Sequence, residues 1–209
     1  MKEKPRKLWR TNTDVKMRND NFSALAAKPQ LGGQNLSIRK KAAIHTKRLT
    51  LKPYAQEDIP ALAKLLQNKE ITKTFMVPDF ETKAQVAVLV QKLISFSSLA
   101  DTRHLEYGIY LGNTLIGFIN DCGIDGDSIE IGYVIHPNHQ GKGYATEAVK
   151  AVLHELKKMG FHKVTAGYFQ ENIASRQVML HCGMEPVDYT DTEEYRGQIH
   201  TCHYCEIKL

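Results

Sequence analysis

Long apolar runs are missing from this sequence of 209 residues. No stretch approaches the ~20 consecutive apolar residues that a membrane-spanning helix needs. The N-terminus also lacks the apolar region of a secretory signal peptide. Internal repeats and low-complexity blocks are absent as well. We therefore expect a cytoplasmic protein with no membrane partner.

Cysteine is scarce, and the sequence has no second cysteine pair of the kind that completes a zinc knuckle. Reduced thiols are expected in the cytoplasm. The spacing Cys202-x-x-Cys205, close to His200 and His203, still suggests a metal or redox site. On a terminal strand, however, those two cysteines would point to opposite faces. We predict no metal and four structural cysteines: Cys122, Cys182, Cys202 and Cys205.

Positive charge is concentrated at the N-terminal end. Residues 1–48 carry thirteen Lys and Arg against three Asp and Glu, a net charge of +10, whereas the remaining residues carry −5. Because residues 1–44 show no sustained hydrophobic period, we predict a flexible basic extension there and one folded domain over 45–209. A solvated tail is the simplest interpretation of the extension. Weak contact with RNA or the ribosome and a transit peptide remain alternatives.

Hydrophobic periodicity predicts strands and helices that alternate along the folded part. Strands precede, separate and follow the helices, which indicates an α/β (α+β) fold with a largely antiparallel mixed sheet. The expected helices cover 59–66, 83–99, 144–159 and 173–182. The expected strands cover 46–53, 106–111, 114–121, 128–135, 163–169, 185–189 and 200–209.

One stretch, His-Pro-Asn-His-Gln-Gly-Lys-Gly-Tyr-Ala-Thr at 136–146, joins an apolar strand to an amphipathic helix. Its two glycines permit backbone conformations that other residues avoid and let a ligand approach the main chain. The first amides of the following helix have no acceptor within the helix and lie at the positive end of its dipole. The stretch therefore predicts an anion site suited to phosphate.

Two common phosphate-binding loops are excluded because their sequence patterns do not match. A Walker A loop needs Ser or Thr after its lysine, but Gly143 follows Lys142; a dinucleotide fingerprint needs a third small residue where Thr146 stands. The order Gln140, Gly143, Ala145 instead resembles the Gln-x-x-Gly-x-Ala pyrophosphate loop of the GNAT acyltransferases. An ordinary strand-to-helix turn is the alternative interpretation of this loop alone.

Downstream residues make the resemblance more specific. The run Asn172-Ile173-Ala174-Ser175, followed by Cys182-Gly183-Met184, is similar to the Asn-x-x-Ser…Gly-Phe block of the RimJ/RimL-like ribosomal-protein N-acetyltransferase branch, with Met184 at the usual Phe position. The strand 130–135 and the ending 195–205 are similar to the same branch. The resemblance covers residues 45–209 and leaves out the basic extension.

The resemblance implies the GNAT acyl-CoA N-acyltransferase fold, a mixed sheet that is splayed at its centre and flanked by helices. It implies that acetyl-CoA enters the gap, with backbone groups of Val134 and Ile135 pairing with the pantetheine and Gln140 ordering the loop. Lys142 either adds charge beside a phosphate or is merely solvated. The amides implied to hold the pyrophosphate belong to Gly141, Lys142, Gly143, Tyr144, Ala145 and Thr146.

The same resemblance implies catalytic roles. A protonated amine cannot attack a thioester, so a base or a water relay must take its proton. Glu130 is the candidate base, and a cross-strand ion pair is its structural alternative. Many family members use a tyrosine as acid where this chain has Met179; the resemblance to the RimJ/RimL-like branch implies Ser175 as the substitute acid, and water is the alternative proton donor. Asn172 either contacts the cofactor or only caps a helix.

The resemblance therefore implies an acetyl-CoA-dependent N-acetyltransferase in which an amine attacks the thioester directly. We expect the acceptor to be a protein N-terminus or a small-molecule amine, selected by the segments 71–80 and 190–197, which carry no motif. For 71–80, core packing is the alternative role. A non-catalytic acyl-CoA sensor and an RNA- or ribosome-associated binding module are the alternative functions. A homodimer is common in the family and is a further expectation.

Overall fold

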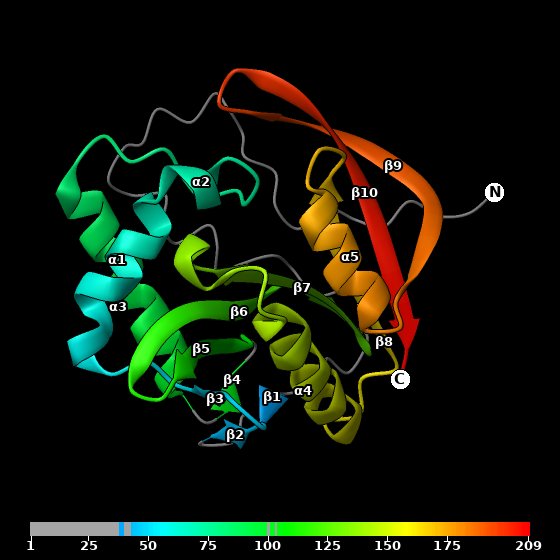
Figure 1. Ribbon diagram of the computed structural model, residues 1–209, viewed down its shortest axis with the longest axis horizontal. Coiled ribbons are helices and arrows are strands. Elements are labelled where there is room, and N and C mark those ends of the chain that lie inside the picture. The colour runs from blue at the N-terminus through cyan, green and yellow to red at the C-terminus, as the bar shows by residue number, and fades with distance from the viewer. Residues whose placement is uncertain (1–37, 40–42, 100, 103) are drawn as a thin grey trace.

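An eight-stranded sheet forms the centre of the computed structural model, which describes residues 38–39, 43–99, 101–102 and 104–209 (Figure 1). The strand order is β2-β3-β5-β6-β7-β8-β10-β9, and β7–β8 is the parallel pair in an otherwise antiparallel sheet. A short pair, β1 with β4, lies apart from the sheet. The expected fold class is confirmed. The strands are β1 (Ile38–Arg39), β2 (Ile44–His45), β3 (Thr50–Lys52), β4 (Asp101–Thr102), β5 (Glu106–Leu111), β6 (Thr114–Asp125), β7 (Ser128–Ile135), β8 (Lys163–Phe169), β9 (Glu185–Tyr195) and β10 (Gln198–Lys208).

Helices cover both faces of this sheet. Pro60 lies in the first turn of α1, and Asp58 occupies the N-cap position without a side-chain cap hydrogen bond. Thr82 and Gln85 form a capping box at the start of α3. The short helix α2 was not expected. The helical segments are η2 (Gln56–Asp58), α1 (Ile59–Gln67), α2 (Lys69–Thr72), α3 (Lys83–Ser98), η3 (Pro137–His139), α4 (Tyr144–Lys158) and α5 (Ile173–His181).

Two hydrophobic clusters lie on opposite faces of the sheet. On one face, α4 and α5 pack on the β7 side chains Ile129, Ile131 and Ile135. On the other face, α1 and α3 pack on Phe118 and Val134. Strand β7 contributes to both because successive side chains of a strand point to opposite faces. Strand β7 therefore lies between the two hydrophobic clusters.

Strands β7 and β8 separate soon after they meet. Their parallel register runs from Ser128 opposite Lys163 to Glu130 opposite Thr165, although the strands continue to Ile135 and Phe169. The splayed sheet that the resemblance implies is therefore present. The gap opens toward the residues that follow β7, which begin the glycine loop.

The N-terminal boundary differs in detail from the expectation. The predicted strand 46–53 is shorter, because Thr46 and Leu49 form a turn with a hydrogen bond from Thr46 N to Leu49 O at 2.9 Å. Strand β3 starts only at Thr50. Ile38 and Ile44 are buried in the core cluster. Most of the predicted basic extension, 1–37 and 40–42, lies outside the described residues.

The C-terminal hairpin also differs from the expectation. The segment 190–197, predicted to be a connection, is mostly strand, because β9 continues to Tyr195 and turns at Arg196 and Gly197. The misjudged stretch is polar and gives no hydrophobic signal; its pairing with β10 supplies the stabilisation. Cys202 and Cys205 face different clusters, as predicted from their spacing.

In the part of the chain that the structure describes, no helix has the length and apolar character of a membrane span.

Candidate functional site

The loop between β7 and α4 is open toward solvent. Gly141 and Gly143 have φ angles of +72° and +77°, which side chains other than glycine rarely adopt. A Cβ at Gly141 would meet nothing within 4 Å, and one at Gly143 would meet only Arg48 Nη2, at 3.5 Å. An extended ligand could therefore lie directly against this backbone.

Helix α4 starts without a side-chain cap, because its N-cap is Gly143. The hydrogen bond from Glu147 N to Gly143 O, 3.0 Å long, is the first that closes a helical turn. The amides of Tyr144, Ala145 and Thr146 precede it and have no acceptor within the helix. Three N–H groups at the positive end of a helix dipole provide a site for a phosphate.

Two side chains of the loop bind back onto its own backbone. Gln140 Nε2 donates to Ile135 O at 2.8 Å, which joins the loop to the end of β7. Lys142 Nζ donates to Asn138 O at 3.2 Å and is exposed. The Gln140 side chain thus links the loop to the strand before it. The Lys142 ammonium lies on the loop, within the same short segment as the amides.

A third contact comes from far away in the sequence and was missed. Arg48, in the turn before β3, donates from Nη1 to Lys142 O at 2.8 Å and from Nε to Glu147 Oε2 at 2.7 Å. Its guanidinium also lies over the Tyr144 ring, 4.5 Å from the centroid. Glu147 accepts a further hydrogen bond from Thr46 Oγ1 at 2.6 Å. The 99 positions between Arg48 and Glu147 explain why no local pattern indicated the contact.

The backbone N–H and C=O groups of β7 point alternately toward β6 and toward the opposite side, where the gap to β8 lies. His136 N donates to Ile116 O at 2.7 Å, continuing the antiparallel ladder with β6. In such a ladder, residues bonded to one neighbour alternate with residues whose backbone groups point away from it. Val134 therefore directs its N–H and C=O toward β6, and Tyr133 and Ile135 direct theirs toward the gap. This differs from the expectation, which gave Val134 the same role as Ile135.

Asn172, Ser175 and Tyr133 meet where α5 begins beside β7. Asn172 Oδ1 accepts from Ser175 N at 3.1 Å, the hydrogen bond of an N-cap. The Tyr133 hydroxyl lies 2.9 Å from Ser175 Oγ and donates to Ser175 O at 3.0 Å. Burial raises the pKa of Tyr133, against the lowering effect of the Ser175 hydrogen bond, so the phenol stays protonated. Tyr133 was not anticipated, because its neighbour on α5 lies 42 positions away.

Glu130 lies on the opposite face of β7 from Tyr133, together with Gly132. A Cβ at Gly132 would come within 3.2 Å of the Phe75 ring and 3.0 Å of Cys122 Sγ, so the missing side chain lets both groups approach β7. Glu130 Oε1 lies 3.6 Å from the position of a Cβ on Gly167. The carboxylate therefore points toward Gly167 of β8, where the two strands have begun to separate, on the side of the sheet that faces α1 and α3.

Negative charge and aromatic rings gather on this side. Burial, followed by the charges of Glu130 and Asp191, raises the pKa of Tyr204. Burial, followed by the charges of Glu130 and Asp121, likewise raises the pKa of Cys122. The Tyr204 and Tyr189 rings pack with centroids 5.6 Å apart. The negative charge of Glu130 contributes to both shifts, and a carboxylate in this place attracts a cation.

The β9–β10 hairpin contacts the end of α2. The Tyr195 hydroxyl donates to Thr72 O at 2.9 Å, and Arg196 Nη1 donates to Thr72 Oγ1 at 2.9 Å. Phe75 packs edge-on against Phe118, with ring centroids 5.4 Å apart. The two segments expected to select the acceptor, 71–80 and 190–197, are therefore in contact with each other.

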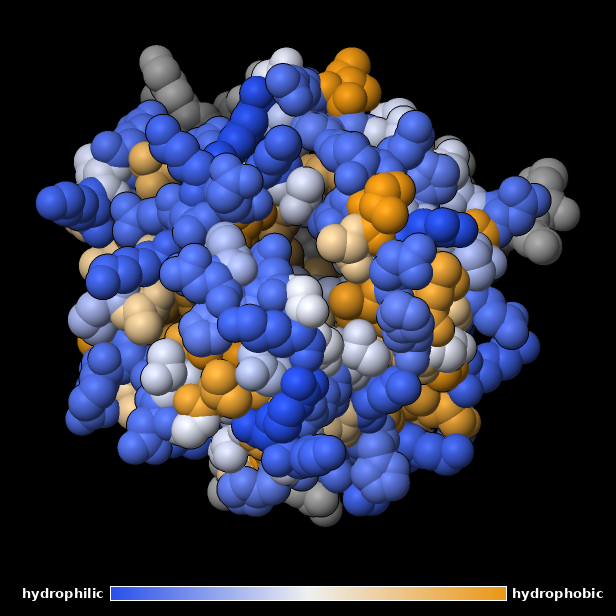
Figure 2. Space-filling view, in the orientation of Figure 1, coloured by the Kyte–Doolittle hydropathy of each residue, from blue (hydrophilic) through white to orange (hydrophobic). Residues whose placement is uncertain are grey.

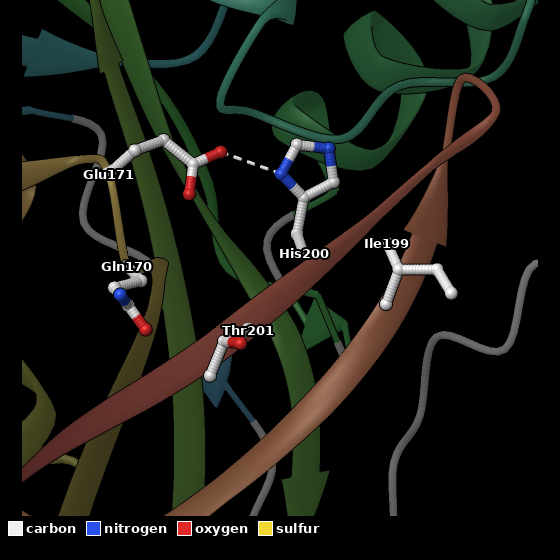
Figure 3. Close-up of a pocket in the computed structure, with 5 residues that line it drawn as sticks. All are labelled: Gln170, Glu171, Ile199, His200 and Thr201. Carbon is white, nitrogen blue, oxygen red and sulfur yellow. Dashed lines mark hydrogen bonds and ion pairs between the residues drawn. The ribbon is translucent and has the colours of Figure 1, made fainter.

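A pocket of about 320 Å³ lies beside this hairpin (Figure 3). The imidazole of His200 points toward Glu171, with Nδ1 2.6 Å from Oε1, and stacks on Phe169 at a centroid distance of 4.2 Å. Burial raises the pKa of the Glu171 carboxyl, but its hydrogen bonds, including that with His200, outweigh this and lower it. The lining residues are Gln170, Glu171, Ile199, His200 and Thr201.

The surface is also hollowed over β7, between α2 and α5, with apolar atoms visible in its depth (Figure 2). Within the described ranges, no group of three or more His, Cys, Asp or Glu side chains is placed to hold a metal ion. What the residues do offer is an open loop of N–H groups, a gap between strands and a carboxylate at the gap. Those features fit a long ligand with phosphates at one end and a reactive group at the other.

Comparisons with known proteins point the same way. The model of the acetyltransferase (GNAT) domain matches residues 48–185. A Bacillus subtilis protein described as the uncharacterized N-acetyltransferase YoaA is 28% identical over 148 residues, which cover 68% of this chain and 82% of that protein.

Solved structures agree in fold. A RimL ribosomal alpha-N-protein acetyltransferase in complex with coenzyme A superposes with a TM-score of 0.70 at 19% identity, covering 80% of this chain and 98% of that one. The microcin C7 self-immunity acetyltransferase MccE, solved with acetyl-CoA and AMP, has a TM-score of 0.68 at 19% identity and covers 78% and 94%.

Proposed function

Because this chain belongs to the GNAT acetyltransferase family, we propose that it transfers the acetyl group of acetyl-CoA to a primary amine, on a protein N-terminus or a small molecule. Family membership favours the enzyme over the sensor and the binding module. Acetyl-CoA is the co-substrate and supplies an acetyl group activated as a thioester. The residues below bind it, orient it and move protons around it.

The glycine loop holds the pyrophosphate. Amides from Gly141 to Thr146 donate to the phosphate oxygens, and the open space at Gly141 admits them to the backbone. Gln140 keeps the loop tied to Ile135 O. Asn172 uses Oδ1 to cap α5, and its amide nitrogen can donate to the ligand that passes this helix end.

Backbone N–H groups in the gap orient the thioester. Tyr133 and Ile135 direct theirs away from β6, and β8 has already separated from them. One of these groups stabilises the negative charge that develops on the thioester oxygen; a donor in that role is worth about 3 kcal/mol in comparable sites. Val134 contributes by packing on the α1 and α3 side.

Glu130 accepts the proton of the attacking amine, directly or through one water. Its carboxylate reaches the gap near Gly167, on the same face as Phe75, Tyr204 and Asp191. A protonated amine is attracted to this carboxylate-rich side, loses its proton to Glu130 and then has the lone pair it needs. The base has to be unprotonated before each turnover.

Ser175 supplies a proton to the departing thiolate. Its Oγ lies 2.9 Å from the Tyr133 hydroxyl, which can replace the proton that Ser175 gives away. On becoming an amide, an ammonium group loses two protons: sulfur gains one, and the other leaves through Glu130 to solvent, so no further reactant is required.

The splay of β7 from β8 immediately before an open glycine loop is the observation that carries this function. The test is to incubate the purified chain with acetyl-CoA and a panel of amines, including N-terminal peptides of ribosomal proteins and a polyamine. We expect release of free thiol together with an acetylated product detected by mass spectrometry. If the protein binds coenzyme A but releases no free thiol with any of these amines, the transfer reaction is rejected and the sensor remains.

Two expectations about partners extend this proposal. The positive charge at the N-terminal end, net +10 over residues 1–48, supports contact with RNA or a ribosome that presents the acceptor. Deleting residues 1–37 should then reduce ribosome association in sedimentation while acetylation of free peptides persists. The proposed homodimer is checked by light scattering on the full chain.

A further inference from the structure

Arg48 and Glu147 form a brace under the glycine loop. A single guanidinium donates to the Lys142 carbonyl at 2.8 Å and to the Glu147 carboxylate at 2.7 Å, and it covers the Tyr144 ring at 4.5 Å. The three residues it touches lie just before, at and just after the start of α4. The brace therefore spans the region whose amides are exposed to a ligand.

The loop needs a restraint from outside because its own residues allow many backbone conformations. Gly141 and Gly143, both at positive φ, leave the intervening peptide groups free of side-chain restrictions. The side chains of Gln140 and Lys142 bind to carbonyls of the same short segment. Arg48 is different, since it reaches the loop from the turn before β3, 94 positions away from Lys142 in the sequence.

Glu147 would harm an anion site if it stood alone. Its carboxylate lies in the first turn of α4, close to the amides proposed to hold a diphosphate. It accepts hydrogen bonds from Thr46 Oγ1 at 2.6 Å, Arg48 N at 2.8 Å and Arg48 Nε at 2.7 Å. Burial opposes ionisation, but these bonds outweigh it and hold the pKa of Glu147 below its usual value. The carboxylate is thus charged, and Arg48 neutralises it.

We propose that Arg48 is a positioning residue for coenzyme A: paired with Glu147, it holds the Lys142 peptide and the start of α4 so that their amides face the diphosphate. The inference rests on the proposed function of the loop. It predicts that Arg48 governs coenzyme A affinity and leaves turnover at saturating acetyl-CoA close to wild type.

The test compares Arg48→Ala, Arg48→Lys and Glu147→Gln with wild type in coenzyme A titration calorimetry and acetyl-CoA kinetics. For Arg48→Ala we expect about a tenfold rise in coenzyme A Kd and acetyl-CoA KM, since a hydrogen bond to a charged group is lost, with kcat changed less than about twofold. Arg48→Lys should resemble Arg48→Ala, because an ammonium cannot serve the carboxylate and the carbonyl as a fork does.

Lys158→Ala is the matched control. Its ion pair with Glu155, 3.1 Å long, lies at the other end of the same helix, away from the loop. We expect unchanged Kd and KM in that variant. In a cycle with Glu147→Gln, the Arg48→Ala effect should shrink, because a neutral glutamine side chain no longer repels the diphosphate.

The outcomes separate this inference from the proposed function. If wild type and Arg48→Ala bind coenzyme A equally well, the positioning role of Arg48 is overturned and the proposed function stands. If Arg48→Ala lowers the melting temperature but leaves the coenzyme A Kd unchanged, Arg48 contributes to stability only, and the positioning role is again overturned. Wild type that binds no coenzyme A in calorimetry overturns both. A selective rise in Kd supports the inference even when no acceptor amine has been identified.

Discussion

In the proposed function, the two sides of β7 recognise their ligands by different means. On the α4 and α5 side, recognition uses backbone: the amides of one continuous loop, two glycines and a helix start. On the α1 and α3 side, it uses side chains from separate elements, among them Glu130 of β7, Phe75 after α2 and Tyr204 of β10. A backbone site suits a cofactor that never changes, whereas a side-chain site can be altered by substitution to suit a different acceptor.

Substitution in the loop should produce the largest effect. Gly143→Asp places a side chain and a negative charge at φ +77° beside the amides. We expect the acetyl-CoA KM to rise about 100-fold, since backbone strain and the loss of a charge-assisted contact each cost on the order of 1–2 kcal/mol. Gly112→Asp is the matched control, at φ +60° in the β5–β6 turn with nothing within 4 Å. Similar kinetics in both variants would refute the loop assignment.

Removal of the proposed base tests the other side. Glu130→Gln should lower kcat by about 100-fold, within the range for loss of a general base, and leave the coenzyme A Kd unchanged. The wild-type rate should fall toward acidic pH as Glu130 is protonated, and the variant should lose that acidic limb. Glu185→Gln, exposed at the start of β9, is the control. An intact acidic limb in Glu130→Gln would give the role to ordered water.

The hydroxyl pair at the gap should have a smaller effect. Ser175→Ala and Tyr133→Phe should each lower kcat by roughly three- to tenfold. The double variant should be no worse than the stronger single one, because the residues act as one unit. Tyr168→Phe on β8, whose ring stacks on His203, is the control. Additive losses would show that the two hydroxyls act separately.

The hairpin contact should have the smallest effect on rate and should sharpen the contrast between sides. Tyr195→Phe removes the hydrogen bond to Thr72 O, which should cost about 1 kcal/mol of unfolding free energy in urea titrations. We expect the acceptor KM to rise about threefold while the acetyl-CoA KM stays constant, since the Tyr195 hydroxyl bonds to the acceptor-side segment. An equal shift in both constants would erase the distinction between the sides.

Much of the cofactor side could be predicted because its signals are local. The glycine loop, the strand before it and the periodic helix after it lie within one run of residues, and β7 and β8 have the expected bounds. Asn172 at the N-cap of α5 follows from the preference of that position for a short polar side chain. Such features depend on hydrogen bonds and periodicity over a few residues.

The acceptor side was predicted less well. The short helix α2 was missed, and most of the segment 190–197 proved to be strand. Its residues Thr190 to Glu194 are polar, so their strand conformation depends on the ladder with β10 rather than on an apolar pattern. The conformation there is decided by the position of β9 at the edge of the sheet, for which the local sequence carries no signal.

The sequence by itself determined the family, the glycine loop proposed to bind the cofactor, and the order of strands and helices around it. Only the tertiary structure decided which β7 residues turn their backbone toward the gap, and that Tyr133 joins Ser175 while Arg48 joins Glu147. The physical reason is range. Caps, turns and periodicity are satisfied by near neighbours, whereas strand partners and ion pairs such as Arg48 with Glu147 are chosen by packing among residues up to 99 positions apart.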